Sequence, residues 1–598
     1  MSARSTQAVV PLVAARAATH FRKVLAAAAV VFVAVHPDVV AQEPLLKREI
    51  VTFEPHHWSS NFGADIQTDG DWAIVTSWQD RTANPSFDGA GSVRVLKRGP
   101  GGWRQHSVLA PPELAFQEHF GKRLGSAHLM GRRIAVAVAT GPGSPNYPEV
   151  FGRVHIFEFD GADWGLVQTI VPLDVPSGLQ YPPIFGHALR FASEDELLIG
   201  SPGDRQWLGA DPGGSYYVYK RRASGGWRFE YKVTQPPAFA TDRRCTLGAP
   251  LRIDGDRAVT LFRSLTRHTA HALELSRSPT SGRWELIDVL AIDGITIDSR
   301  AEDFDFVGDW IFVADDNRGQ GASGRVLTLK RTATGWEQQL DLAPPEPYSV
   351  WTPSGLIANE GFGSGLDFDG NRLVVSSMEG FVPGREGRAE TFVYDGARWT
   401  REHLVVPDDV HVNSRTFGDG VALAGPSILA GFRTYLTEDP AAMPPEYEGG
   451  VIFAYDLPRG SLVCSGAPNS TGNGGALAMF GSRSAATGDV YGKADSLPVG
   501  TFCLPLVATE TDFVAGVGGG SGNLCLGGSI GRMYGQLGPA DPAGAFEFDV
   551  DTTALPLATG LGAIASGETW YFQVWYRDFT GVQPTQNFTH AMGIAFTD

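Results

Sequence analysis

Acidic side chains follow several of the predicted β-strands, in positions where a pair of them could work as general acid and base. Asp80, Asp204 and Asp316 each follow a short apolar run, and Asp315 and Glu379 stand in comparable places. Two carboxylates with separated pKa values in one cleft are the machinery of a glycoside hydrolase or a lyase. Convergence of Asp80, Asp204 and Asp316 in a deep pocket therefore favours an enzyme, whereas their separation along an open rim favours a binding surface.

Aromatic side chains accompany these acids in the predicted long loops. Ring faces stack on the apolar faces of sugars or peptides, and neighbouring carboxylates fix hydroxyl groups or cations. The alternative is that the rings pack only against their own loops. The candidate ligand-binding residues are Trp58, Trp78, Asp80, Tyr147, Asp204, Trp207, Asp316 and Trp351.

Signals for other chemistry are weaker. The sequence contains no nucleophile elbow, zinc-protease helix motif or phosphate-binding loop. The adjacent pair His56 and His57 suits an exposed loop about as well as a metal site, and no further ligands can be assigned, so no metal is predicted.

Four cysteines are too few for a disulfide scaffold and lack zinc spacing. The simplest bridge joins Cys464 to Cys525, although other pairings stay open.

An internal repeat organises the middle of the chain and must position these residues. Each repeat opens at an apolar residue followed by glycine, or at a variant of that pair, and the period is about 59 residues. The seven openings are Phe62-Gly63, Phe120-Gly121, Phe185-Gly186, Leu247-Gly248, Asp303-Phe304, Phe362-Gly363 and Phe417-Gly418.

Each repeat predicts four short strands. Turns such as Asp69-Gly70-Asp71 and Asp254-Gly255-Asp256 join the first two strands, because these residues tolerate a positive φ. A glycine opens the third strand, as in Gly152-Arg153-Val154. Four strands in each of seven units predict an all-β fold, a seven-bladed β-propeller.

A tryptophan marks the fourth strand of six repeats. Because these residues share one structural position, we expect them to pack between neighbouring sheets rather than to stack on a ligand. They are Trp103, Trp164, Trp227, Trp284, Trp336 and Trp399.

The ring is expected to close through the start of the mature chain. The seventh repeat changes character at Pro458 without a fourth strand marked by tryptophan. Residues 47–54, just before the first Phe-Gly pair, are predicted to supply that strand and complete the seventh blade. Such closure removes exposed sheet edges. The predicted propeller extends over residues 42–458.

These repeats resemble the FG-GAP repeats of integrin α chains and of many secreted bacterial proteins. The resemblance covers residues 45–458 and implies a propeller with a role in adhesion or extracellular recognition. It also implies calcium binding, but the family's loop of alternating Asp or Asn before Gly is absent from the turns between first and second strands, which are too short. No cofactor is therefore expected.

The N-terminal residues have the pattern of a secretory signal peptide. Basic residues up to Lys23 precede an apolar run from Val24 to Val35, and small residues precede the predicted cleavage near Ala41. The run is 12 residues long, too short to cross a bilayer as a helix. We expect residues 1–41 to be removed and the protein to be secreted, or to lie at the cell surface or in the periplasm, without membrane insertion.

The C-terminal part differs in composition from the repeats. From Ser461 onward the chain is rich in glycine and poor in basic residues, and alternating stretches such as 545–550 and 570–576 predict strands. We expect a small β-sandwich over residues 461–598. It is similar to a module found at the end of secreted bacterial proteins.

The overall charge limits the class of partner. A formal net charge of −18 argues against binding to nucleic acid or to acidic membranes.

The leading expectation is a non-enzymatic recognition module whose long-loop face binds an extracellular protein or polysaccharide. The alternatives are a secreted carbohydrate-active hydrolase or lyase that uses axial carboxylates, and a structural cell-envelope protein. The oligomeric state does not follow from the sequence.

Overall fold

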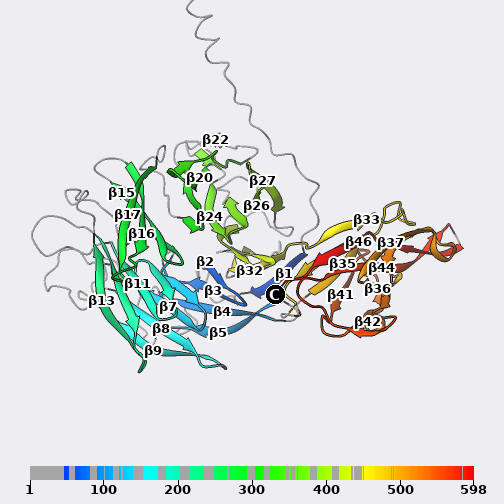
Figure 1. Ribbon diagram of the computed structural model, residues 1–598, viewed down its shortest axis with the longest axis horizontal. Helices are drawn as coiled ribbons and strands as arrows, with labels where there is room; N and C mark the ends of the chain where they lie inside the picture. Colours follow the sequence, from blue (N-terminus) through cyan, green and yellow to red (C-terminus); the bar gives the residue numbers. More distant parts are fainter. Residues whose placement is uncertain are drawn as a thin grey trace, which may run out of the picture. The chain divides into compact units, whose positions relative to one another are not determined.

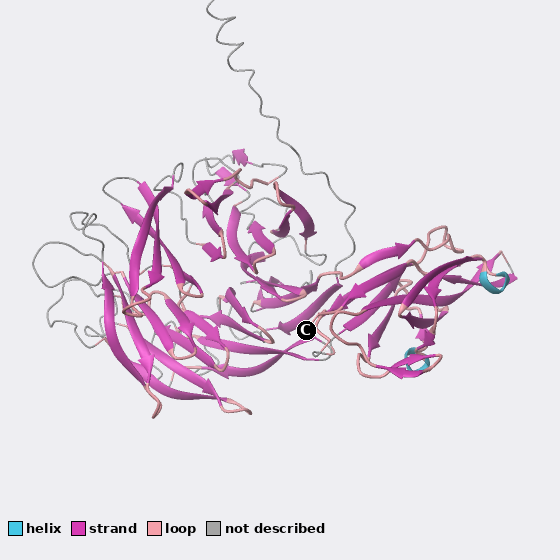
Figure 2. Ribbon diagram, viewed as in Figure 1, coloured by secondary structure: helices cyan, strands magenta, loops and turns pink. Residues whose placement is uncertain are grey.

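Antiparallel β-sheets make up the computed structural model, and no α-helix occurs in the part of the chain that it describes (Figure 2). Two short 3₁₀ turns, Val517–Gly519 and Tyr534–Gln536, interrupt the strands. The structure describes residues 46–52, 61–80, 90–99, 102–111, 120–122, 125–138, 152–172, 184–202, 214–234, 248, 250–264, 269–292, 303–315, 324–344, 349–351, 357–359, 361–377, 387–406, 417–432, 435–436, 447–448, 450–485, 488, 490–581 and 583–597. None of the helical elements among these residues is long and apolar enough to cross a membrane.

Seven four-stranded sheets follow the predicted repeat (Figure 1). In six of them the four strands are consecutive in the sequence and pair in chain order. These strands are β2 (Phe62–Asp69), β3 (Trp72–Ser77), β4 (Ser92–Gly99) and β5 (Gly102–Leu109); β6 (Ala127–Met130), β7 (Arg133–Val138), β8 (Arg153–Phe159) and β9 (Trp164–Ile170); β10 (Leu189–Ser193), β11 (Glu196–Ser201), β12 (Ser215–Arg221) and β13 (Trp227–Thr234); β14 (Leu251–Asp254), β15 (Arg257–Ser264), β16 (Thr269–Arg277) and β17 (Trp284–Ile292); β18 (Phe304–Val307), β19 (Trp310–Asp315), β20 (Arg325–Thr332) and β21 (Gly335–Gln338); β24 (Phe362–Phe368), β25 (Arg372–Ser377), β26 (Arg388–Tyr394) and β27 (Trp399–Val405).

The remaining four-stranded sheet joins the two ends of the repeat region. It contains β28 (Phe417–Ala424), β29 (Ser427–Phe432), β32 (Val451–Asp456) and, as its outer strand, β1 (Leu46–Thr52). The pairing of β1 with β32 is antiparallel, with Lys47 opposite Tyr455 and Thr52 opposite Val451. The strand expected at residues 47–54 thus takes the place of the missing fourth strand, and residues 53–54 lie outside the described part of the chain.

The first strands of the sheets contact one another in a cyclic order. Each contacts the first strand of the next sheet along the chain, and β28 contacts β2. The sheets that contain β2 and β28 also share a hydrophobic cluster. In it, Leu96 and Trp103 of one sheet pack with Ala422 and Leu429 of the other. The side chain of Thr68 also donates a hydrogen bond to the main-chain oxygen of Leu423 across the same boundary.

The glycine that opens the third strand lets the next repeat approach closely. A Cβ atom on Gly152 would lie 2.1 Å from the main-chain oxygen of Phe185, so only glycine fits. The same relationship recurs along the chain between a third-strand glycine and a fully buried phenylalanine of the following repeat. The further pairs are Gly91 with Phe120, Gly324 with Phe362, Gly387 with Phe417, and Gly450 with Phe62.

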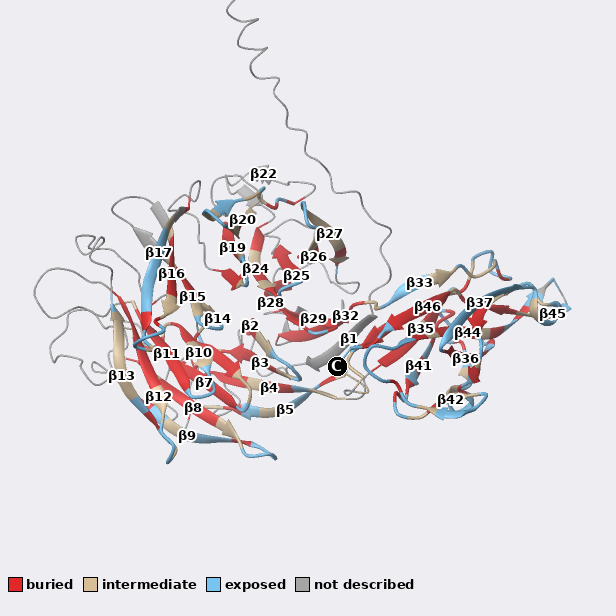
Figure 3. Cartoon of the chain, in the orientation of Figure 1, coloured by how far each residue is buried: buried red, intermediate tan, exposed pale blue. Residues whose placement is uncertain are grey.

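Burial within each sheet follows the order of its strands. Second strands such as β7, β11 and β25 are buried, whereas the fourth strands β9 and β17 expose most of their residues (Figure 3). The tryptophans at the fourth strands are exceptions and pack into clusters that join two sheets. Trp164 contacts the cluster of Ile74 and Val93, and Trp284 that of Leu198 and Tyr216, as the sequence predicts.

Two small hairpins lie within the repeat region, and further strands form the C-terminal region. The hairpins pair β22 (Ser349–Trp351) with β23 (Ile357–Asn359) and β30 (Tyr435–Leu436) with β31 (Tyr447–Glu448). The C-terminal strands are β33 (Ser461–Cys464), β34 (Ala476–Gly481), β35 (Val490–Asp495), β36 (Phe502–Ala508), β37 (Glu510–Ala515), β38 (Asn523–Gly527), β39 (Gly531–Arg532), β40 (Gly538–Pro539), β41 (Phe546–Val550), β42 (Leu555–Leu557), β43 (Gly560–Gly562), β44 (Thr569–Thr580), β45 (Gln583–Phe588) and β46 (Ala591–Ala595).

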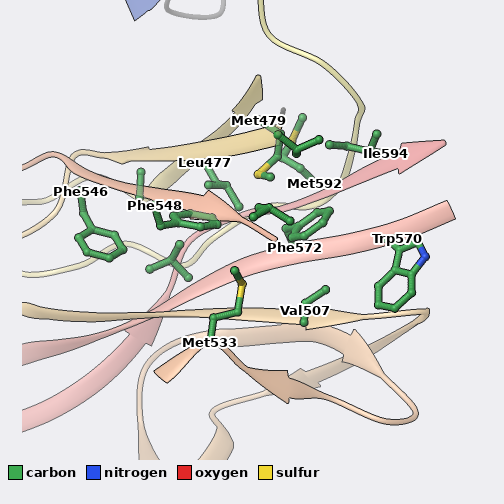
Figure 4. Packing of buried hydrophobic residues seen from close by; sticks show 14 of the residues in the cluster. Leu477, Met479, Val507, Met533, Phe546, Phe548, Trp570, Phe572, Met592 and Ile594 are labelled. Atoms are coloured by element: carbon green, nitrogen blue, oxygen red, sulfur yellow. The ribbon is translucent and has the colours of Figure 1, made fainter. Parts of the chain in front are cut away.

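Two C-terminal sheets enclose a hydrophobic core (Figure 4). Met479 and Phe548 come from the sheet of β34, β35 and β41, and Phe572 and Met592 come from the sheet that contains β44 and β46. The alternation predicted for residues 545–550 appears in β41, whose residues are buried and exposed in turn. A disulfide joins Cys464 to Cys525, the pair named from the sequence.

Candidate functional site

A cavity of ≈ 220 Å³ lies among the first strands of all seven four-stranded sheets. Its lining is strongly charged, and we refer to it as the charged cavity. The lining residues lie along the first strands up to the hairpin turns, and Gly125 and Asp303 come just before β6 and β18 begin. Its charged or titratable members are Asp65, His128, Arg190, Arg252, Asp303, Asp305 and Asp367.

Strand geometry explains why these polar groups share one face. Arg252, Asp305 and Asp367 each lie three residues before the glycine of a hairpin turn, as do Gln67 and His128. Their apolar neighbours in sequence are buried between sheets, as Leu251, Phe304 and Leu366 show. Because side chains alternate along a strand, the polar residue between two buried ones points to the opposite face.

Most of these side chains bind the main chain of the next first strand. A first strand has one edge without a partner in its own sheet, so its N–H and C=O groups need other partners. The bonds run from Gln67 Nε2 to Ala127 O (2.7 Å), from Phe191 N to His128 Nδ1 (3.1 Å), from Arg190 Nε to Leu251 O (2.9 Å), from Phe368 N to Asp305 Oδ2 (2.8 Å) and from Leu423 N to Asp367 Oδ2 (2.7 Å). We call this set the inter-strand belt.

Arg252 connects its strand to the next one by ion pairs. Its Nη2 lies 3.1 Å from Asp303 Oδ1, and its Nε lies 3.2 Å from Asp305 Oδ1. Asp303 in turn accepts a hydrogen bond from the main-chain N–H of Leu366 at 2.9 Å. Both carboxylates are therefore held by a guanidinium and by main-chain donors.

Burial shifts the titration of the cavity residues. Loss of solvation raises the pKa of Asp303 to about 6 and that of Asp367 to about 8, with the nearby charge of Asp305 adding to both shifts. The same cause lowers the pKa of Arg190 to about 9 and holds that of His128 well below its usual value. The raised pKa favours the protonated form of Asp367 near neutral pH, and the lowered pKa favours the neutral form of His128.

The residues predicted from the sequence have different surroundings. Asp80 is buried after β3, where it accepts a hydrogen bond from Ser92 Oγ at 2.5 Å and lies 4.0 Å from Arg94. Asp80 does not line the charged cavity. Trp78 is half-buried, with the ammonium of Lys122 5.0 Å from its ring centre.

The other predicted ligand-binding residues give less information. Trp351 is the last residue of β22. The meeting of Asp80 with Asp204 and Asp316 stays a prediction, because two of these three residues are not described. Trp58, Tyr147, Asp204, Trp207 and Asp316 all lie outside the described part of the chain.

The carboxylates that do meet come from the first strands, which the sequence analysis did not consider. Their signal was a polar residue between two apolar ones, three residues before a hairpin glycine, as in Leu251-Arg252-Ile253 and Leu366-Asp367-Phe368. This pattern is also typical of a strand with one solvated face. The repeat of the pattern at the same position of successive units was the signal that could have identified the cavity.

The described residues hold no group of three or more His, Cys, Asp or Glu side chains arranged to bind a metal ion. Comparison with known proteins adds no assignment, since neither a family model nor a curated protein matches the chain.

Proposed function

We propose that the protein is an exported, non-enzymatic recognition protein built on a closed seven-bladed propeller of the FG-GAP type. The cyclic contacts of the first strands and the pairing of β1 with β32 support closure of the ring. The disulfide between Cys464 and Cys525 supports an oxidising compartment, in keeping with the signal-peptide pattern of residues 1–41.

The inter-strand belt is the observation that carries the proposal. Within the belt, Asp305 binds the main-chain N–H of Phe368. Beside the belt, Asp303 binds the N–H of Leu366, and both carboxylates pair with the guanidinium of Arg252, so they stabilise the arrangement of the sheets. Recognition is then left to the loops, which vary in length and sequence without disturbing the belt.

The loops at one end of the sheets provide the larger surface. Two residues separate β2 from β3, whereas fourteen separate β3, which ends at Ser77, from β4, which begins at Ser92. Because strands alternate in direction, a second strand ends, and the third strand begins, at the end of the sheet away from the tight hairpin. Trp78 stands at the start of one such connection and suits stacking on a sugar or a peptide.

A binding survey tests this proposal. The mature chain would be applied to arrays of polysaccharides and of extracellular proteins, together with Trp78→Ala and Trp207→Ala variants. We expect saturable binding of at least one ligand, with an affinity that falls about tenfold or more in at least one variant. Binding that is unchanged in both variants would reject the long-loop face.

The alternative is a secreted carbohydrate-active hydrolase or lyase. It is favoured by two carboxyl groups of raised pKa, those of Asp303 and Asp367, in a single cavity. It predicts release of new sugar ends from a polysaccharide panel and loss of that activity in Asp367→Asn. Absence of any turnover in the folded wild-type protein would leave recognition as the function.

A further inference from the structure

The charged cavity contains a hydrogen-bond donor that the inter-strand belt does not use. His128 lines the cavity and is 8% exposed. The N–H of Phe191 donates to Nδ1, so the proton of the neutral ring is on Nε2. Nε2 has no hydrogen-bond partner among the described residues, and a ligand atom in the cavity that accepts a hydrogen bond would pair with this donor.

Asp367, on a first strand four sheets further along the cyclic order than that of His128, has a carboxyl oxygen that can accept a further hydrogen bond. Its Oδ2 accepts the N–H of Leu423, whereas no described residue binds its Oδ1. The side chain retains part of its surface and lines the same cavity as His128. A cationic group placed at Oδ1 would gain a charge-assisted hydrogen bond.

The balance of charge around the cavity favours a cation. Four carboxyl groups face it, from Asp65, Asp303, Asp305 and Asp367, and two guanidinium groups, from Arg190 and Arg252, oppose them. The proton that the raised pKa of Asp367 retains near neutral pH relieves part of this excess of acid. A cation bound at Asp367 would replace that proton, so its binding should release a proton.

The volume limits the ligand to a small molecule. At ≈ 220 Å³ the cavity exceeds the roughly 150 Å³ cavities that hold a benzene-sized guest. Its charged lining excludes such an apolar guest.

We propose that the charged cavity binds a small ammonium compound that also carries a hydrogen-bond acceptor, such as an amino alcohol. Its ammonium group lies at Asp367, and its hydroxyl oxygen accepts the Nε2 proton of His128. The two residues that would contact the ligand, Asp367 and His128, each lie three positions before a hairpin glycine, toward the end of the strand away from the long loops.

Titration calorimetry of the full mature chain with ethanolamine tests the proposal, in two buffers of different ionisation enthalpy that contain no primary amine. We expect saturable binding near pH 7.5 with net proton release. Ethylammonium, which lacks the acceptor, should bind about tenfold more weakly, and glycerol, which lacks the charge, should not bind. Absence of a saturable signal with ethanolamine, or equal affinity for ethylammonium, would overturn the proposal.

Three variants assign the site to its residues. Asp367→Asn keeps an oxygen for the N–H of Leu423 and removes the charge, and His128→Asn keeps an acceptor for the N–H of Phe191 and removes the Nε2 donor. Each should weaken ethanolamine binding about tenfold. Asp254→Asn, at an exposed carboxylate that accepts the N–H of Gly308 outside the cavity, should leave it unchanged. Unaltered affinity in a folded Asp367→Asn protein would contradict the assignment, and if that variant does not fold, His128→Asn decides in the same way.

Discussion

The main-chain N–H of Leu423 donates a hydrogen bond to the side chain of Asp367 at 2.7 Å, and so links the exposed edge of one sheet to the next. Similar bonds connect β2 to β6 and β18 to β24. The polar residues of the interior therefore serve the cohesion of the sheets. Because some of these residues are also acidic, mutation and pH should both change the stability of the protein.

Stability should fall as the pH rises through the range in which Asp303 and Asp367 titrate. Their folded-state pKa values of about 6 and about 8 lie above the ordinary value of 3.8, so the native state binds more protons than the unfolded chain between these limits. The free energy of unfolding then decreases from about pH 4 to about pH 8, by several kcal/mol. Urea unfolding at several pH values measures this change.

The variant Asp367→Asn isolates the contribution of one carboxyl group to the pH dependence of stability. Asp367→Asn cannot ionise, so its unfolding free energy should depend less on pH, and above pH 8 it should equal or exceed that of the wild type. Asp254→Asn, in an exposed hairpin, serves as the control. An identical pH profile for wild type and Asp367→Asn would contradict the assignment.

Close approach between repeats should make Gly152 sensitive to substitution. Gly152→Ala places a Cβ atom 2.1 Å from the oxygen of Phe185 and keeps a φ of +90°, so we expect a loss of more than about 3 kcal/mol. Gly225→Ala shares the positive φ, at +83°, but meets no atom within 4 Å, and should cost about 1 kcal/mol. Equal losses in denaturant unfolding would show that the contact with Phe185 has no effect.

The marker tryptophans should differ in their contributions to stability. Trp284 donates from Nε1 to the buried carboxylate of Glu196 at 2.9 Å, whereas Nε1 of Trp164 is buried without a partner in the described part of the chain. Replacement by phenylalanine removes similar volume at both sites. Trp284→Phe should therefore cost about 1 kcal/mol more than Trp164→Phe, because Glu196 loses one hydrogen bond while it keeps the one from Arg277 Nη1 at 2.9 Å. Thermal unfolding of the two variants would contradict this if Trp164→Phe were the less stable.

In the C-terminal region, the disulfide between Cys464 and Cys525 should stabilise the fold, whereas the free thiol of Cys503 should be unreactive. Cys464 and Cys525 are 61 residues apart, so reduction should destabilise this region by about 4 kcal/mol in the chain-entropy estimate. Burial raises the pKa of Cys503 to about 12, which suppresses its thiolate. A thiol reagent at pH 8 should label Cys503 only after denaturation, and rapid labelling of the native protein would contradict its burial.

The local elements could be predicted from the sequence because their determinants are local. Turns such as Asp69-Gly70 specify the first hairpins, and the tryptophan markers specify where fourth strands begin, as Trp164 and Trp284 do at β9 and β17. The strand expected at residues 47–54 is β1, and its partner β32 was inferred from a missing strand.

The charged cavity could not be predicted in the same way. Asp65 and Asp367 are 302 positions apart and face one cavity because the first strands of different sheets come together. In the sequence each is a polar residue beside apolar ones, which is equally typical of a solvated strand. Asp80, selected because it ends a second strand, binds Ser92 within its own sheet instead.

Cross-linking of β1 to β32 tests the ring closure on which the account depends. Arg48 and Ala454 are paired residues of these strands, so the double variant Arg48→Cys with Ala454→Cys should form a disulfide in the folded protein. Arg48→Cys with Ala430→Cys is the control, because Ala430 lies on β29, beyond β32. Pairing of β1 with β32 predicts rapid oxidation of the first pair alone, seen as a faster-migrating band on a non-reducing gel and a higher unfolding midpoint. Failure of the first pair to cross-link in the folded protein, or equal cross-linking of both pairs, would contradict it.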